Sequence, residues 1–174
     1  MMIVGCGNSD LGAHLYERGF HYVTNVDYSA VVIEYMTARH KNYDHMEYVE
    51  MDVTETIELG EDSFFNCIID KGTLDCVLCN EDEQEASHKA ENMLQNMYKN
   101  LTPGGCFICV SRGAPETRML YFQSPALNGW SVETLKVQKK ATNSKPGLDS
   151  NNDEVFDRID IEPFYYVYIC DKKY

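Results

Sequence analysis

Short runs of apolar residues recur along the chain, and most of them end at glycine, proline or polar residues. Runs of this length and content are typical of strands that are buried on one or both faces of a sheet. The pattern predicts strands at 2–4, 22–26, 48–51, 64–69, 106–110 and 164–169. A further strand is predicted at 130–137, where apolar and polar residues alternate.

Segments with helical spacing separate the first of these strands. The segment 9–18 places two leucines four residues apart and ends at Gly19, and the residues after Ser29, a favourable N-cap, repeat apolar side chains at three and four. The clearest helix spans 83–100, where apolar residues recur at steps of four and three until the Pro-Gly-Gly sequence at 103–105 interrupts the pattern. Three helices are therefore predicted.

The order of these elements predicts an α/β fold. Strands that alternate with helices form a parallel sheet with helices on both faces. Because the segments 130–137 and 164–169 have no convincing helix between or after them, we expect them to close the sheet as an antiparallel pair. The polar segment 139–154 between them contains Pro146-Gly147, and we expect a long surface loop there. A single domain over 1–174 results.

Composition narrows the class of protein. The chain of 174 residues has 44% hydrophobic residues, which suits one packed core, and carries 28 acidic against 15 basic side chains, a net charge of −13. Such a charge opposes nucleic-acid binding; it either attracts basic partners or simply keeps the domain in solution. No stretch approaches the ~20 apolar residues of a membrane span, and no signal-peptide pattern opens the chain. We expect a cytoplasmic, monomeric protein.

Seven cysteines raise the question of a metal site. They include two CxxC pairs, Cys76 with Cys79 and Cys106 with Cys109, but the gap between the pairs is longer than the ~15–20 residues of a zinc ribbon. Moreover, Cys106 and Cys109 lie in a predicted strand, where positions three apart point to opposite faces. We therefore expect no metal and interpret the cysteines as buried thiols.

The first candidate for chemistry is the glycine turn Gly5-Cys6-Gly7, which follows a strand and opens a helix. Such a turn lets the backbone approach a ligand closely. It is not a complete GxGxxG motif, because Asp10 stands at the last glycine position. That carboxylate would repel a dinucleotide pyrophosphate, whereas S-adenosylmethionine has no phosphate and carries cationic groups. The turn therefore favours S-adenosylmethionine over a dinucleotide.

Acidic residues follow three further strands. Asp27 comes 20 residues after Gly7, where a carboxylate can accept both ribose hydroxyl protons; a turn or cap aspartate is the alternative. Asp52-Val53 can read an adenine amino edge, and Asp70-Lys71 ends the fourth strand. Because ligands of open α/β sheets bind at the carboxyl ends of strands, the four sets together indicate one site.

On these and neighbouring motifs the sequence resembles the class I, seven-stranded methyltransferases that use S-adenosylmethionine. Within them it is similar to the elongation-factor-1A lysine methyltransferase branch, in particular to its small type related to the domain joined to an endothelin-converting enzyme. The Asp-Lys-Gly-Thr-Leu-Asp sequence at 70–75 is the most specific of the motifs. The others are Ile3 to Ser9, Val23 to Ser29, Ala38-Arg39-His40, Met51-Asp52-Val53, Pro103-Gly104-Gly105 and Gly129-Trp130-Ser131.

The resemblance implies a Rossmann-like, mostly parallel sheet, S-adenosylmethionine as cofactor, and a lysine of elongation factor 1A as the methyl acceptor. By resemblance, Gly5 lies under the methionine part of the cofactor, Asp27 and Tyr28 hold the ribose region, and Lys71 lies beside the cofactor at the floor of the site. The full cofactor-binding set implied in this way is Gly5, Cys6, Gly7, Asp27, Tyr28, Asp52, Val53, Asp70 and Lys71.

Two features depart from the pattern of the family. Asp70 stands where the branch often has glutamate. Only four residues precede Gly5, whereas the family normally has a longer N-terminal segment with aromatic residues that close over the cofactor. The resemblance therefore implies that this chain lacks the family's N-terminal helical segment.

The catalytic residues are less defined. Methyl transfer to lysine needs a neutral, well-placed amine, and Asp70 and Asp75 are candidates to orient it, although Asp75 equally suits a cap or an ion pair at a helix start. No general base is assigned. Because a fold does not determine a substrate, two alternatives remain: a small-molecule methyltransferase of the same fold, and a non-catalytic cofactor-binding module.

Overall fold

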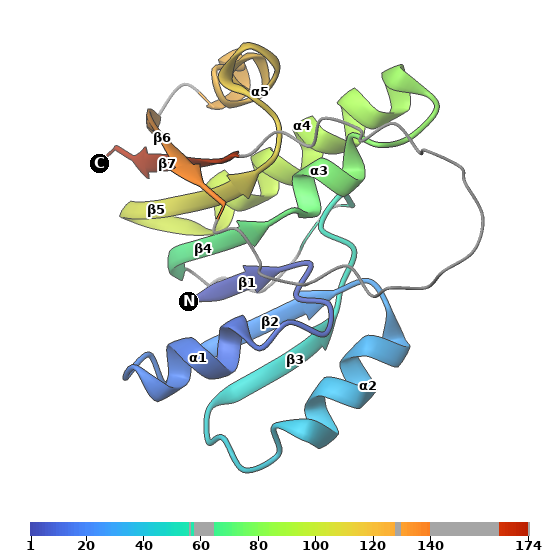
Figure 1. Ribbon diagram of the computed structural model, residues 1–174, viewed down its shortest axis with the longest axis vertical. Coiled ribbons are helices and arrows are strands. Elements are labelled where there is room, and N and C mark those ends of the chain that lie inside the picture. Colours follow the sequence, from blue (N-terminus) through green and yellow to red (C-terminus); the bar gives the residue numbers. More distant parts are fainter. Residues whose placement is uncertain (56, 58–64, 128–129, 140–163, 174) are drawn as a thin grey trace, which may run out of the picture.

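The computed structural model describes residues 1–55, 57, 65–127, 130–139 and 164–173. Its strands are β1 (Met2–Val4), β2 (Val23–Asp27), β3 (Met46–Glu50), β4 (Phe65–Lys71), β5 (Leu101–Ser111), β6 (Trp130–Gln138) and β7 (Phe164–Lys172). Its helices are α1 (Leu11–Glu17), α2 (Ala30–Arg39), α3 (Thr73–Val77), α4 (Glu83–Asn100), α5 (Pro115–Phe122) and the 3-10 helix η1 (Pro125–Leu127). Figure 1 shows how they are arranged.

The strands form one sheet in the order β3-β2-β1-β4-β5-β7-β6. β1 to β5 pair in parallel, β7 runs antiparallel to β5, and β6 runs antiparallel to β7. The predicted α/β fold with an antiparallel closing pair is confirmed. The order reverses direction between β1 and β4, and ligands of open sheets bind at such a switch point.

Alternation along β1 divides the core between the two faces of the sheet. Met2 and Val4 face a large apolar cluster that contains α4, α5 and the start of α3, whereas Ile3 faces a smaller cluster with α1 and α2. Both faces therefore carry helices, as the sequence predicts.

The helix α4 has the bounds that its apolar spacing predicts. Its N-cap Asp82 accepts hydrogen bonds from the backbone N–H groups of Gln84 and Glu85 at 3.0 and 3.1 Å. Met93 and Met97 on its apolar stripe are fully buried. Burying such a side chain contributes about 1.5–3 kcal/mol, so this stripe fixes α4 firmly against the sheet.

The second face is covered unevenly. The helices on that face, α1 and α2, contact β2 and β3, while α3, α4 and α5 all pack on the first face. On β6, Leu135 and Val137 point to the second face and stay 43% and 45% exposed. In the described part of the chain, no helix covers this half of the face.

Some boundaries differ from the sequence prediction. β5 begins at Leu101 and includes the Pro-Gly-Gly sequence, which only interrupts its pairing with β4 through a register shift between Phe65 and Cys67. The helices α3 and α5 were not predicted from the sequence. The expected polar loop at 139–154 lies outside the described residues, except for Lys139.

The seven cysteines differ in exposure, and Cys67 and Cys106 are partly buried. Cys6, Cys109 and Cys170 are buried thiols, as expected, but Cys76 and Cys79 are exposed, so that interpretation is wrong for this pair. They belong to α3 and the turn after it, where no strand covers them. Within the described residues, no helix is both long and apolar enough to cross a membrane.

Candidate functional site

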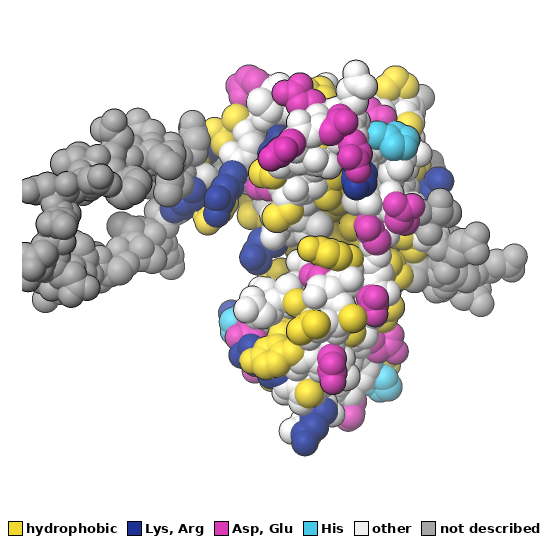
Figure 2. All heavy atoms as spheres, turned by 90° about the vertical axis from the view of Figure 1, so that its right-hand side faces the viewer, with side chains coloured by type: hydrophobic (Ala, Val, Ile, Leu, Met, Phe, Trp, Pro, Cys, Tyr) yellow, Lys and Arg dark blue, Asp and Glu magenta, His cyan; other side chains and the backbone are white. Residues whose placement is uncertain are grey.

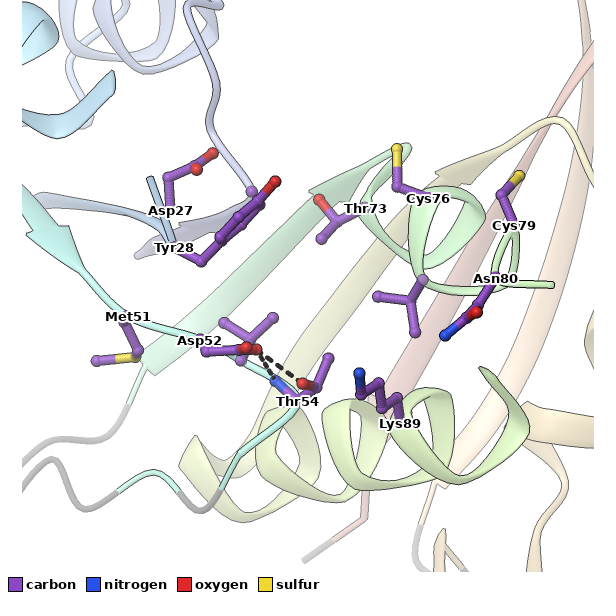
Figure 3. A pocket seen from close by; sticks show the side chains of 13 residues that line it. Asp27, Tyr28, Met51, Asp52, Thr54, Thr73, Cys76, Cys79, Asn80 and Lys89 are labelled. Atoms are coloured by element: carbon purple, nitrogen blue, oxygen red, sulfur yellow. Dashed lines mark hydrogen bonds between the residues drawn. The ribbon is translucent and has the colours of Figure 1, made fainter. Parts of the chain in front are cut away.

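A cavity of about 350 Å³ opens where β1, β2 and β3 end. Figure 2 views this edge of the sheet, where the molecule is hollowed between the side that carries α3 and α4 and the side that carries α2. Figure 3 shows the residues that line the cavity, which come from five separate parts of the chain. They are Gly5, Asp27, Tyr28, Met51, Asp52, Val53, Thr54, Thr73, Cys76, Val77, Cys79, Asn80 and Lys89.

The glycine turn forms the floor of the cavity and packs against the start of α3. Gly5 and Gly7 have φ of +57° and +51°, a left-handed conformation that favours glycine. A Cβ on Gly5 would lie 2.0 Å from the Oγ1 of Thr73, whose hydroxyl donates to the carbonyl of Val4 at 2.9 Å. Only glycine leaves room for this contact, so backbone rather than a side chain faces a ligand here.

Asp27 braces the glycine turn from the end of β2. Its Oδ2 accepts from the backbone N–H of Gly7 at 2.9 Å, and its Oδ1 accepts from that of Ser29 at 3.0 Å. The residue is only 8% exposed, and yet it lines the cavity, whereas the neighbouring Tyr28 is 76% exposed at the rim. Each carboxylate oxygen keeps a lone pair for a ligand hydroxyl.

The strand β3 leads into a loop that two sets of hydrogen bonds hold in place. Asp52 Oδ1 accepts from the backbone N–H and the hydroxyl of Thr54 at 2.9 and 2.7 Å. On the other side, the amide of Asn96 on α4 donates to the carbonyls of Val53 and Glu55 at 3.0 and 2.6 Å. These bonds fix one wall of the cavity, where a carboxylate stands beside the apolar Val53.

The opposite wall was not foreseen from the sequence. Thr73, Cys76 and Val77 of α3 line the cavity, because residues three and four apart share a helix face. Cys79 and Asn80 continue this wall (Figure 3). Lys89 reaches in from α4, where it pairs with Glu85 at 2.6 Å. Lys89 is remote from the other residues in sequence, so only the packing of α4 brings it to the site.

Asp70 is fully buried and does not line the cavity. Its two oxygens accept from the backbone N–H groups of Thr73 and Leu74 at 2.7 and 3.1 Å, and from the thiol of Cys109 at 3.2 Å. Desolvation raises the pKa of this carboxyl above its ordinary value. The residue holds the first turn of α3 onto β4.

Asp75 and Lys71 also lie outside the cavity. The carboxylate of Asp75 accepts from the Ser111 hydroxyl, from the backbone N–H of Arg112 at 2.7 Å, and from the Arg118 guanidinium at 3.0 Å. Lys71 lines two other hollows, one of them shared with Gly5 and Cys6, and the other with Asp75. The structure therefore brings together Gly5, Asp27, Tyr28, Asp52 and Val53 of the predicted set, and leaves Cys6, Gly7, Asp70, Asp75 and Lys71 around them.

Asp10 does not face the ligand cavity, although its position in the glycine motif suggests that it would. Its carboxylate pairs with Arg39 on α2 at 2.9 Å and lies 3.8 Å from His40. Burial lowers the pKa of His40, which keeps that contact weak at neutral pH. Because Asp10 is not among the cavity residues, its charge serves the contact between α1 and α2.

The cavity fits S-adenosylmethionine better than a phosphate-bearing ligand. The N–H of Gly7 is already bound to Asp27, and Lys89, the cation among the lining residues, is paired with Glu85. What the cavity offers instead is the carboxylates of Asp27 and Asp52 between apolar walls. Such a donor set suits hydroxyl and amino groups, an aromatic ring and a positive charge.

Comparison with known proteins agrees with this chemistry. Residues 2–156 match the family model described as "Methyltransferase domain". The chain is 34% identical over 143 residues to the eEF1A lysine and N-terminal methyltransferase of Xenopus laevis, covering 82% of this chain and 20% of the relative. It is 35% identical over 138 residues to EEF1A lysine methyltransferase 4 of Bos taurus, covering 76% and 52%. The chain thus spans a fifth to about half of the length of these curated relatives.

Solved structures agree on the fold. The N-methyltransferase NodS from Bradyrhizobium japonicum WM9, in complex with S-adenosyl-l-homocysteine, superposes with a TM-score of 0.63 at 16% identity. The match covers 98% of this chain and 76% of NodS. At this identity the likeness shows a shared architecture.

Proposed function

The chain belongs to the class I S-adenosylmethionine-dependent methyltransferases, and from that premise we propose that it transfers a methyl group to a lysine of translation elongation factor 1A. The observation that carries the proposal is the 34–35% identity to relatives whose names state this substrate. The Asp-Lys-Gly-Thr-Leu-Asp sequence at 70–75 and the acidic surface, which suits a basic protein partner, support it. Such a substrate also favours a cytoplasmic setting.

The cavity suggests how the cofactor is held. Asp27 would accept hydrogen bonds from the ribose hydroxyls, with Tyr28 at the rim beside them. Asp52 and the backbone of Val53 would bind the adenine amino edge, and the methionine part would lie over the backbone of Gly5. Cys6 and Gly7 would contribute indirectly, because they shape the glycine turn but do not line the cavity.

The chemistry is an in-line displacement. S-adenosylmethionine supplies an electrophilic methyl group on a sulfonium; the lysine nitrogen forms the new N–C bond, the S–C bond breaks, and the amine proton passes to solvent. With an ordinary lysine pKa near 10.4, deprotonation at about pH 7.4 costs about 4 kcal/mol. Apolar side chains such as Val77 can lower that cost by desolvating the amine. Positioning then supplies much of the rate.

We propose positioning roles, rather than contact with the amine, for Asp70 and Asp75. Asp70 supports α3 from below, and Asp75 is bound by three donors. We propose no general base, because water can accept the proton after the amine has entered the site in its neutral form.

The test is methyl transfer from tritiated S-adenosylmethionine to recombinant elongation factor 1A, followed by peptide mass spectrometry. We expect label on one lysine with the wild-type chain, loss of label with Asp27→Asn, and full label with Asp44→Asn, an exposed aspartate before β3. Label only on small molecules when a cell extract is added would favour the small-molecule alternative. No label, together with intact cofactor binding, would favour the binding module.

A further inference from the structure

A second cavity lies on the other side of the first turn of α3. It has a volume of about 270 Å³ and is lined by Lys71, Gly72, Asp75, Val110, Arg112 and Tyr165. Thr73 and Cys76 of α3 face the cofactor cavity, whereas Asp75 faces this one. The first turn of α3 lies between the two cavities, because Gly72 lines the second one and its neighbour Thr73 lines the first.

Two cations converge on this second cavity. Lys71 and Arg112 are both exposed, and neither side chain has an anionic partner in the part of the chain that the structure describes. Asp75 does not neutralise them, because its oxygens are already bound to Ser111, Arg118 and the backbone N–H of Arg112. This is unusual in a chain with a net charge of −13.

The loop that carries Arg112 is held in place. The N–H of Gly113 donates to the Ser111 hydroxyl at 2.9 Å, and the hydroxyl of Tyr168 donates to the Gly113 carbonyl at 2.7 Å. A Cβ at Gly113 would lie 2.2 Å from the Arg118 guanidinium carbon, so the loop packs closely onto that side chain. A cation on a fixed loop loses little freedom when it binds an anion, which favours a specific contact.

We propose that this basic pocket, formed by Lys71, Arg112 and Tyr165, binds a carboxylate side chain of the protein substrate that lies a few residues from the methylated lysine. The proposal rests on the proposed function and adds a sequence preference to it. Neighbouring residues at the start of α3 line the two cavities, so a chain that places its lysine at the cofactor would pass close to Lys71 and Arg112. A guanidinium binds a carboxylate in a bidentate way, while the overall negative charge disfavours nucleic-acid phosphate.

Binding and turnover of peptides separate this inference from the proposed function. The probes are fluorescein-labelled 15-residue peptides with one central lysine and a single glutamate within three residues of it, each matched by a glutamine version. Their affinity is measured by fluorescence anisotropy with the chain saturated by S-adenosylhomocysteine, and methyl transfer is measured in parallel. Arg112→Gln removes the proposed contact, and Lys41→Gln, at the other edge of the sheet, makes the same change of charge.

We expect at least one glutamate peptide to bind about fivefold more tightly than its glutamine version, as an accessible ion pair of about 1 kcal/mol predicts. Arg112→Gln should remove this preference and Lys41→Gln should keep it. Equal affinity for all pairs, or no binding, overturns the inference. So does a change in the pH profile of turnover in Arg112→Gln without a change in preference, because the cation would then act on the amine. A preference in binding without methyl transfer would sink the proposed function alone.

Discussion

Asp27→Asn is the sharpest perturbation of the site, because it removes a charge without removing volume. The carboxylate serves two backbone donors, Gly7 and Ser29, and also faces the cavity. The carboxamide keeps one acceptor oxygen but turns an NH₂ group toward the other N–H. A strand-end carboxylate contributes little to packing, and from the sequence alone a substitution here should leave stability untouched. The two hydrogen bonds change that expectation.

The substitution should lower both the stability of the fold and the affinity for the cofactor, and the two losses can be estimated separately. Leaving one buried backbone donor without an acceptor costs about 1–3 kcal/mol of folding free energy. Loss of charge-assisted hydrogen bonds to the ribose costs about 2–4 kcal/mol of binding, which is a roughly 30- to 700-fold weaker Kd. Calorimetry with S-adenosylmethionine measures the second, and denaturant unfolding without cofactor measures the first. Asp44→Asn serves as the control for both.

The affinity for adenosine shows which part of the cofactor loses its contact in Asp27→Asn. Adenosine contains the ribose, so its affinity should fall with Asp27→Asn by a similar factor. A folded Asp27→Asn protein that binds S-adenosylmethionine with unchanged Kd would refute the assignment of Asp27 to the ribose. An unchanged unfolding free energy would refute its role as a brace of the glycine turn.

Two further outcomes follow from the cavity walls. Gly5→Ala should lower the unfolding free energy by about 1–3 kcal/mol, measured by denaturant titration, because the new Cβ has an unfavourable φ and collides with Thr73; a stability equal to the wild type would contradict the packing described at the turn. At pH 8 maleimide should label the exposed Cys76 and Cys79 quickly, and S-adenosylmethionine should slow both reactions. Cys6 should stay unlabelled, because burial raises its pKa to about 12 and the thiolate appears only as the pH rises toward that value; rapid labelling of Cys6 on mass spectrometry would argue against this burial.

The sequence predicts those parts of the fold in which a pattern of apolar residues is long or repeated. The helix α4 has several turns of one apolar stripe, and the strands show either a short apolar run, as in β4, or alternating apolar and polar residues, as in β6. The order of strands and helices then implies a parallel sheet, and the absence of a helix after 130–137 implies the closing pair. Asp27 and Asp52 could be found because a site at strand ends depends only on where strands end.

The remaining wall of the cavity could not be found in this way. The helix α3 has only five residues, Thr73–Val77, too few for a periodic pattern, and it starts after Gly72 in a left-handed conformation. Its exposed Cys76 looks in the sequence like a small core residue. Lys89 looks like any solvent-facing lysine of an amphipathic helix. Asp70, in contrast, stands at a strand end as a ligand residue would, but it is fully buried, and its oxygens accept from the backbone of α3 and from the Cys109 thiol.

The uneven covering of the sheet by helices affects how strongly molecules of this chain associate with one another in solution. β6 forms the outer edge of the described sheet, and Leu135 and Val137 on it are open to solvent beside the half-covered face. Apolar strands at an edge invite pairing between molecules, while a net charge of −13 keeps molecules apart. This repulsion reaches about 10 Å at 0.1 M salt and about 3 Å at 1 M. Dilute salt should therefore preserve this repulsion, whereas salting-out steps during purification remove the force that holds the edge strands of different molecules apart.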